Sequence, residues 1–133
     1  MRSLHITDVR DVLSQVFPGR VYHFHAPTEA VDKGGAYAVW GETSLGTAPA
    51  DDASDEWTPS GMIYLYTQKE YDGRVDDAIT LLETAGVTIS PGRIGWDDTT
   101  QMIAYEIGWT ITCAPGELYT YIMPPRPQAG GQT

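Results

Sequence analysis

The sequence contains little of what disulfide formation or nucleic-acid binding requires. It has one cysteine, Cys113, so no disulfide can form within a single chain. Lysine and arginine together number 8, against 18 aspartates and glutamates, which gives a formal net charge of -10. Contacts to phosphates need clustered basic side chains, so this balance argues against a nucleic-acid-binding domain and against binding to an anionic membrane.

Long apolar runs are also lacking. No segment approaches the roughly 18–20 apolar residues of a membrane-spanning helix, and Met1 begins no apolar stretch of signal-peptide length. We therefore expect a protein that is made and kept soluble, with no membrane contact. Its 133 residues, 41% hydrophobic and 20% charged, are typical of one globular domain with one core.

Recognisable catalytic motifs are missing as well. Glycine-rich phosphate loops, cysteine pairs, His-Glu-x-x-His and Gly-x-Ser-x-Gly do not occur, so we expect no enzyme activity and no cofactor. The alternative is a small metal- or ligand-binding enzyme domain that uses His23 and His25. Two residues apart on a strand, these side chains would project on the same side and could share a metal ion. No third ligand is evident, which favours a pair of surface or interface histidines.

Two acidic groups are explained without catalysis. Asp97 and Asp98, followed by two threonines, are typical of a tight hairpin turn. The other group lies in the polar segment 43–60 and lacks the alternating spacing and central glycine of a calcium loop. We expect it to form a solvated acidic loop that faces an axial partner or the lumen of an assembly. Its members are Asp51, Asp52, Asp55 and Glu56.

The most regular pattern in the chain is an alternation from Met102 to Cys113. Apolar residues occupy every second position, and side chains on a strand alternate between its two faces, so the pattern predicts a long strand with one face in the core. The Cys113 thiol falls on that buried face. The opposite face is small and lightly charged, which suits contact with another molecule better than contact with water.

The other elements complete an α+β fold. A helix over residues 9–17, capped by Thr7 or Asp8, precedes strands at 20–26 and 36–42, which we expect to pair. Residues 61–68 predict a central strand covered on both faces. A second helix is expected between Asp72 as its N-cap and Gly86 at its end, and short strand segments at 87–89 and 93–96 lead into the long strand.

This order of elements, helix, strand, strand, strand, helix, strand, strand, favours a mostly antiparallel sheet with both helices packed on one face. We expect one domain over residues 1–113 and an extended arm, rich in proline and glycine, over residues 114–133. The arm contains apolar residues that suit docking on another copy of the chain.

Aromatic composition favours assembly. The chain has four tryptophans and eight tyrosines against two phenylalanines, and tryptophan and tyrosine are enriched at protein interfaces. Trp109, Tyr105 and Phe24 are expected to fill the core. The remaining large side chains are more than one small core needs, and we take them as interface candidates: Trp40, Trp57, Tyr64, Tyr66, Tyr119, Tyr121 and Ile122.

Four blocks, at residues 21–27, 36–42, 61–72 and 102–109, resemble in order and spacing the tail terminator and minor capsid, or tail completion, proteins of long-tailed bacteriophages. The resemblance runs from about residue 13 to residue 112. It implies a structural virion protein, made in the bacterial host cytoplasm, that forms a hexameric ring. The ring would cap the tail tube and join it to the head-neck connector or stopper protein, and DNA would pass through without specific binding. Another neck or tail completion protein is the alternative within the same particle.

Overall fold

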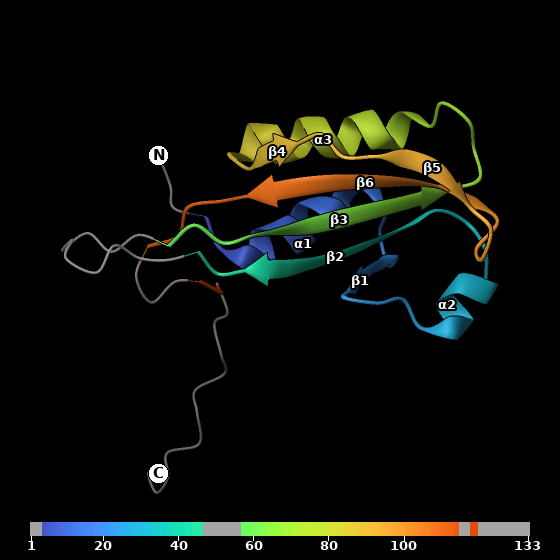
Figure 1. Cartoon of the computed structure of the whole chain (residues 1–133), viewed down its shortest axis with the longest axis horizontal. Coiled ribbons are helices and arrows are strands. Elements are labelled where there is room, and N and C mark those ends of the chain that lie inside the picture. Colours follow the sequence, from blue (N-terminus) through green and yellow to red (C-terminus); the bar gives the residue numbers. More distant parts are fainter. Residues whose placement is uncertain (1–3, 47–56, 115–117, 120–133) are drawn as a thin grey trace, which may run out of the picture.

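The computed structural model describes residues 4–46, 57–114 and 118–119. The predicted α+β class is confirmed: the described chain forms three helices and a mostly antiparallel sheet of six strands (Figure 1). The elements are α1 (Ile6–Val16), β1 (Val21–His23), α2 (Thr28–Asp32), β2 (Tyr37–Ser44), β3 (Ser60–Thr67), α3 (Gly73–Ala85), β4 (Thr88–Ser90), β5 (Ile94–Asp97) and β6 (Met102–Thr110).

The strands follow the spatial order β1-β2-β3-β6-β4, and β5 also pairs with β6. The predicted central position of β3 is confirmed, because β3 is antiparallel to both β2 and β6. Strands β1 and β2 pair as expected, but they run parallel. The reason is α2, a short helix that the sequence analysis missed, which connects the two strands and replaces a hairpin turn.

Strands β4 and β5 form one interrupted edge along β6. Ser90 pairs with Gly108 and Ile94 pairs with Tyr105, so three residues of this edge face two residues of β6. This extra residue makes a β-bulge. Gly92 is required there, because a Cβ at this position would lie 1.8 Å from the carbonyl oxygen of Glu106.

Helices α1 and α3 cover one face of the sheet and enclose the main core. The helix α1 begins at a capping box around His5, whose backbone N–H donates to Asp8 at 2.8 Å, so the expected caps Thr7 and Asp8 are wrong by two or three residues. The α3 caps are as predicted: Asp72 accepts from Arg74 N at 3.0 Å, and Gly86 is left-handed with φ 106°.

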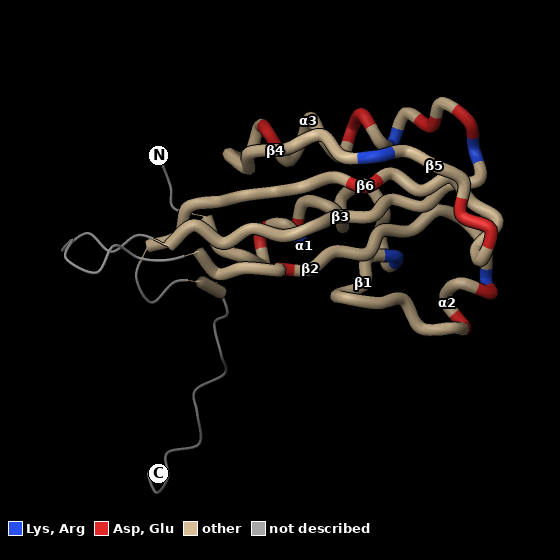
Figure 2. Tube along the Cα trace, in the orientation of Figure 1, with Lys and Arg blue, Asp and Glu red and all other residues tan. Residues whose placement is uncertain are grey.

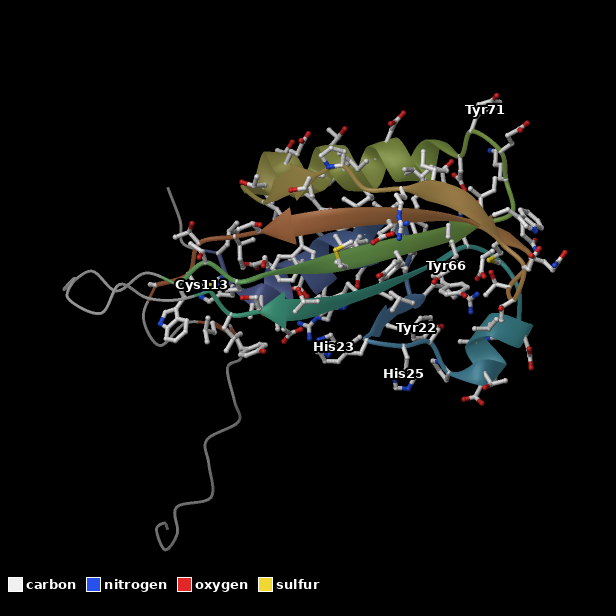
Figure 3. The ribbon with its side chains drawn as sticks, in the orientation of Figure 1. Tyr22, His23, His25, Tyr66, Tyr71 and Cys113 are labelled. Atoms are coloured by element: carbon white, nitrogen blue, oxygen red, sulfur yellow. The ribbon has the colours of Figure 1, made fainter. Side chains whose placement is uncertain are left out.

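The main core contains four of the residues that the alternation assigned to it, Ile107, Trp109, Ile111 and Cys113, whereas Tyr105 is half-buried against the core and Ile103 lies outside it. Trp109 is 1% exposed, and the Cys113 side chain is fully buried, as predicted. Figure 3 shows Cys113 at the end of the sheet beyond β6. Cys113 lies past the last strand residue and forms an isolated antiparallel bridge with Trp57. Through this bridge, pairing continues beyond the end of β6 as far as Cys113.

The second face of the sheet carries a smaller cluster at one end. Its buried members are Tyr37, Val39 and Met102, and Ala26 and Val31 of the α2 region pack against them. Along β3 the side chains alternate between buried and half-buried. Within the described residues, β3 is therefore buried on the helix-covered face and only half-buried on the second face, so the prediction that both faces are covered is confirmed for the first face only.

Candidate functional site

The edge strand β5 carries the most exposed large apolar side chains of the described sheet. Ile94 is 70% exposed and Trp96 is 58% exposed. They pair with Tyr105 and Ile103 of β6, so all four side chains lie on the helix-covered face, where the helices leave Ile94 and Trp96 largely exposed. Residues of this kind contribute apolar area to protein interfaces.

The backbone of β5 is also available for pairing. Arg93 N donates to Glu106 O at 3.1 Å, and Glu106 N donates to Arg93 O at 2.7 Å. Because bonded residues alternate along an antiparallel strand, the N–H and C=O groups of Ile94 and Trp96 point away from β6. Among the described residues, no strand pairs with this outer side. Such an edge is a template for an added strand.

Grooves flank β5 on both sides of the sheet. A groove of about 420 Å³ on the second face is lined by Tyr64, Tyr66, Gly95 and Ala104, with Arg93 and Asp97 at its rim. A groove of about 320 Å³ lies on the other face between α3 and β5. Its lining includes Val75, Ile79, Ile94, Tyr105 and Ile107. A strand added to β5 would therefore lie beside a mainly apolar groove on the helix-covered face and beside a groove of mixed polarity on the second face.

The opposite edge of the sheet is built differently. Strand β1 has three residues and ends at a turn in which His25 N donates to His23 O at 2.9 Å. Phe24, at the centre of this turn, has φ 71° and is 60% exposed, so its expected place in the core is wrong. Its ring lies over Gly41, where a Cβ would come within 2.6 Å of the ring.

The aromatic rings at this edge form a short stack. The His23 ring lies 4.0 Å from the Phe24 ring and 4.4 Å from the Trp40 ring, measured between centroids. Trp40 is 4% exposed and packs in the main core, so it offers little area to a partner. The exposed end of the stack is Phe24, which makes this edge an apolar surface distinct from that of β5.

A hydrogen-bonded cluster closes the same edge. His23 Nε2 donates to Glu42 Oε1 at 2.6 Å, and Tyr119 Oη donates to Glu42 Oε2. Burial by itself would raise the pKa of Glu42, but the bonds from Tyr119 and His23 outweigh burial and lower the pKa. The hydrogen bond to Glu42, together with burial, raises the pKa of Tyr119 to about 12. The cluster fastens residue 119 to β2.

Residues 118–119 pack on the chain's own domain. The backbone N–H of Ile6 donates to Leu118 O at 2.6 Å, and the Leu118 side chain contacts the main core. Figure 1 shows this segment beside the end of β2. Docking on another copy was the expectation for the whole arm, and for Leu118 and Tyr119 the observed contacts are within the chain. Tyr119 remains 44% exposed.

The structure separates the two histidines that were considered as a metal pair. His23 is the last residue of β1, whereas His25 follows the turn and lies off the strand (Figure 3). Their side chains therefore do not project from one strand face. Within the described part of the chain, no group of three or more His, Cys, Asp and Glu side chains is placed to hold a metal ion.

The other interface candidates lie in several places. Tyr64 and Tyr66 are half-buried on the second face and line the groove beside β5, and Tyr66 stacks on Tyr37 at 4.8 Å. Trp57 is half-buried against the main core. Six candidates lie outside the described residues: Asp51, Asp52, Asp55, Glu56, Tyr121 and Ile122.

Basic side chains are scarce on the described surface, and one of them is used inside the fold. Figure 2 shows acidic positions on α1, α2, α3 and the turn between β5 and β6, with few basic positions between them. The Arg20 guanidinium donates to Ala30 O at 2.9 Å and to Gly34 O at 2.6 Å. It also lies over the Tyr37 ring, 5.5 Å from the centroid. Arg20 thus fastens α2 to the β1 edge.

Comparisons with known protein families and with curated proteins find no match to this chain. Within the described ranges, none of the helices has the length and apolar character that crossing a bilayer requires.

Proposed function

We propose that this chain is a structural virion protein, a tail terminator that forms a hexameric ring. In this proposal the ring caps the tail tube and joins it to the head-neck connector or stopper protein. The proposal includes no catalytic role. The phage assignment rests on the four sequence blocks that resemble tail terminators, and the ring rests on the two edges of the sheet.

The observation that carries the ring proposal is the presence of two unlike apolar surfaces at opposite edges. One edge presents Ile94 and Trp96, and the other presents Phe24 beside β1. A ring of identical subunits needs such a pair, because each subunit contacts its two neighbours through two different surfaces. A symmetric dimer would instead use one surface twice.

Charge supports the passage of DNA through the ring. The formal charge of -10 per chain would repel a duplex, whereas a basic lining would retain it.

Termination of a polymer requires that one side of the ring match the tube subunit and that the other side not repeat that surface. The acidic segment that contains Asp51, Asp52, Asp55 and Glu56 is our candidate for the axial or lumen-facing part.

The proposal is tested with the full chain purified without an affinity tag. We expect multi-angle light scattering to give the mass of a hexamer, alone or after tail tubes are added, and negative-stain microscopy to show rings at one tube end. Trp96→Ser should weaken assembly, and Tyr71→Ser, which alters an aromatic side chain that is 87% exposed in the loop between β3 and α3, is the matched control and should not.

Three results would count against this function. A chain that stays monomeric with and without tubes contradicts the ring. Rings that bind connector particles but no tube end would identify a different neck protein. Stoichiometric metal in the untagged protein, lost in His23→Ala, would favour the enzyme alternative.

A further inference from the structure

We infer that β5 is the docking site for the segment Thr120–Met123 of a neighbouring copy, which adds to the sheet as a further strand. This inference rests on the proposed ring and names the contact that closes it. The β5 edge offers outward-pointing backbone groups at Ile94 and Trp96, exposed apolar side chains at the same two residues, and a groove on each face. These are the features by which an extended segment is recognised at a sheet edge.

The starting point of the segment is fixed by residues 118–119. Leu118 is bonded through its carbonyl oxygen to Ile6 N, and Tyr119 is bonded to Glu42 near the end of β2. The chain that follows Tyr119 therefore starts from the β1–β2 side of the sheet. This is the edge opposite β5.

The reach of the chain excludes its own β5. Ile94 of β5 pairs with Tyr105 of β6, Tyr105 pairs with Leu65 of β3, and Leu65 pairs with Ala38 of β2. Ile94 and Ala38 are therefore three strand spacings apart across the sheet, or about 14 Å. Glu42, which the Tyr119 side chain contacts, lies four residues further along β2, about 13 Å, so Glu42 and Ile94 are separated by about 19 Å. Four residues beyond Tyr119 span at most about 14 Å, and the arm would also have to pass around the sheet. The apolar segment can therefore meet β5 of a neighbour, but not its own.

The segment matches β5 in length and chemistry. Residues 120–123 carry no charge, include Tyr121, Ile122 and Met123, and end at Pro124, which cannot donate to a strand ladder. Strand β5 also has four residues. Because side chains alternate, Tyr121 and Met123 would enter one flanking groove and Ile122 the other.

The ring geometry brings these two parts together. In a head-to-tail ring, the β1–β2 edge of one copy faces the β5 edge of the next. Tyr119 lies at the first edge, so an arm that continues from it would cross the contact without a long path. Removal of the arm should then weaken the ring while each domain remains folded.

Cysteine pairs in the full-length chain test the inference. Gly95→Cys is suitable on β5, because a Cβ there meets no atom within 4 Å and Trp96 stays intact. It is combined in turn with Tyr121→Cys, Ile122→Cys and Met123→Cys, while the buried Cys113 remains in place. Under mild oxidation we expect a ladder of cross-linked chains whose yield alternates along the three arm positions, as strand pairing requires. Tyr71→Cys replaces Gly95→Cys as the control and should give no ladder.

The outcomes separate this inference from the proposed function. Rings that form without arm cross-links overturn the docking of the arm and leave the ring. Cross-links within one chain, seen as a monomer of altered mobility, also overturn the inference. A ladder from Gly95→Cys combined with Phe24→Cys, in place of an arm cysteine, would show that β5 contacts the β1 edge of the neighbouring copy and not its arm. Absence of both rings and cross-links contradicts the ring and the arm together.

Discussion

The two edges of the sheet differ in how far other parts of the chain cover them. At the β1 edge the strand is three residues long, a turn at Phe24 ends it, and α2 and residue 119 are fastened beside it. At the β5 edge the four-residue strand keeps its outer backbone groups, and Ile94 and Trp96 remain exposed. Soluble proteins normally protect sheet edges by brevity, bulges or cover. The comparison favours a β1 edge that is fastened for stability while Phe24 stays exposed, and a β5 edge that is left open for the association we propose.

The largest loss of stability is expected when the β1 edge is opened at Arg20. Arg20→Ala removes the hydrogen bonds that hold α2 and leaves the carbonyls of Ala30 and Gly34 without this donor. We expect the free energy of unfolding to fall by about 2–3 kcal/mol, since bonds to charged groups are among the stronger ones. Urea denaturation measures it. The control Arg10→Ala removes an exposed pair with Asp11 and should cost less than about 0.5 kcal/mol.

A smaller loss is expected when the Phe24 ring is displaced. Gly41→Ala places a Cβ 2.6 Å from the ring, so the ring must move away from β2. Because the Phe24 ring is 60% exposed and can move toward solvent, we expect a cost of about 1 kcal/mol, at the low end for overpacking. The matched double variant Gly41→Ala with Phe24→Ala removes the clash. A double variant no more stable than the sum of both single changes would contradict the observed contact between these residues.

The hydrogen-bonded cluster at Glu42 should give a pH-dependent contribution of about 1 kcal/mol. The pKa of Glu42 is lowered in the folded chain, so its contribution is complete above the ordinary glutamate pKa and is lost as the pH falls through the folded value. The pKa of Tyr119 is raised to about 12 in the folded chain. Its contribution to stability is therefore complete below the ordinary tyrosine pKa of about 10, and it is lost as the pH rises toward 12.

The measurement is the difference in unfolding free energy between wild type and Tyr119→Phe across this pH range. We expect the difference to be largest between about pH 5 and pH 9 and to shrink at both ends. A difference that is independent of pH would show that Tyr119 contributes by packing alone, without its bond to Glu42.

The β5 edge should show the smallest change in stability and the clearest change in association. Trp96→Ser alters a side chain that is 58% exposed, so we expect less than about 0.5 kcal/mol in the free energy of unfolding. Sedimentation velocity should show a large loss of assembly in the same variant. Loss of stability similar to that of Arg20→Ala would mean that both edges serve the fold, and the comparison would fail.

The sequence predicted the elements whose patterns are long and local. The alternation of β6 identified the buried Cys113, and Asp72 and Gly86 marked the ends of α3 because caps depend on near neighbours. The helix α2 was missed because five residues after Pro27 carry no helical period. The parallel pairing of β1 with β2 follows from that helix.

The candidate surfaces were less accessible to sequence reasoning. Ile94 and Trp96 alternate like buried strand residues, and they stay exposed because β5 is an edge strand that the helices cover incompletely. Trp40 was taken for an interface residue and lies in the core, whereas Phe24 was taken for core and lies outside. Exposure depends on which strands become edges, and that is a tertiary property.

The most direct test of the central claim is a cryo-EM structure of the assembled full-length chain. The account predicts a closed hexameric ring in which Ile94 and Trp96 of each copy are buried and a strand from the next copy lies along β5. A ring that leaves Trp96 in solvent, or a chain that remains monomeric at every concentration and on tail tubes, would contradict the account.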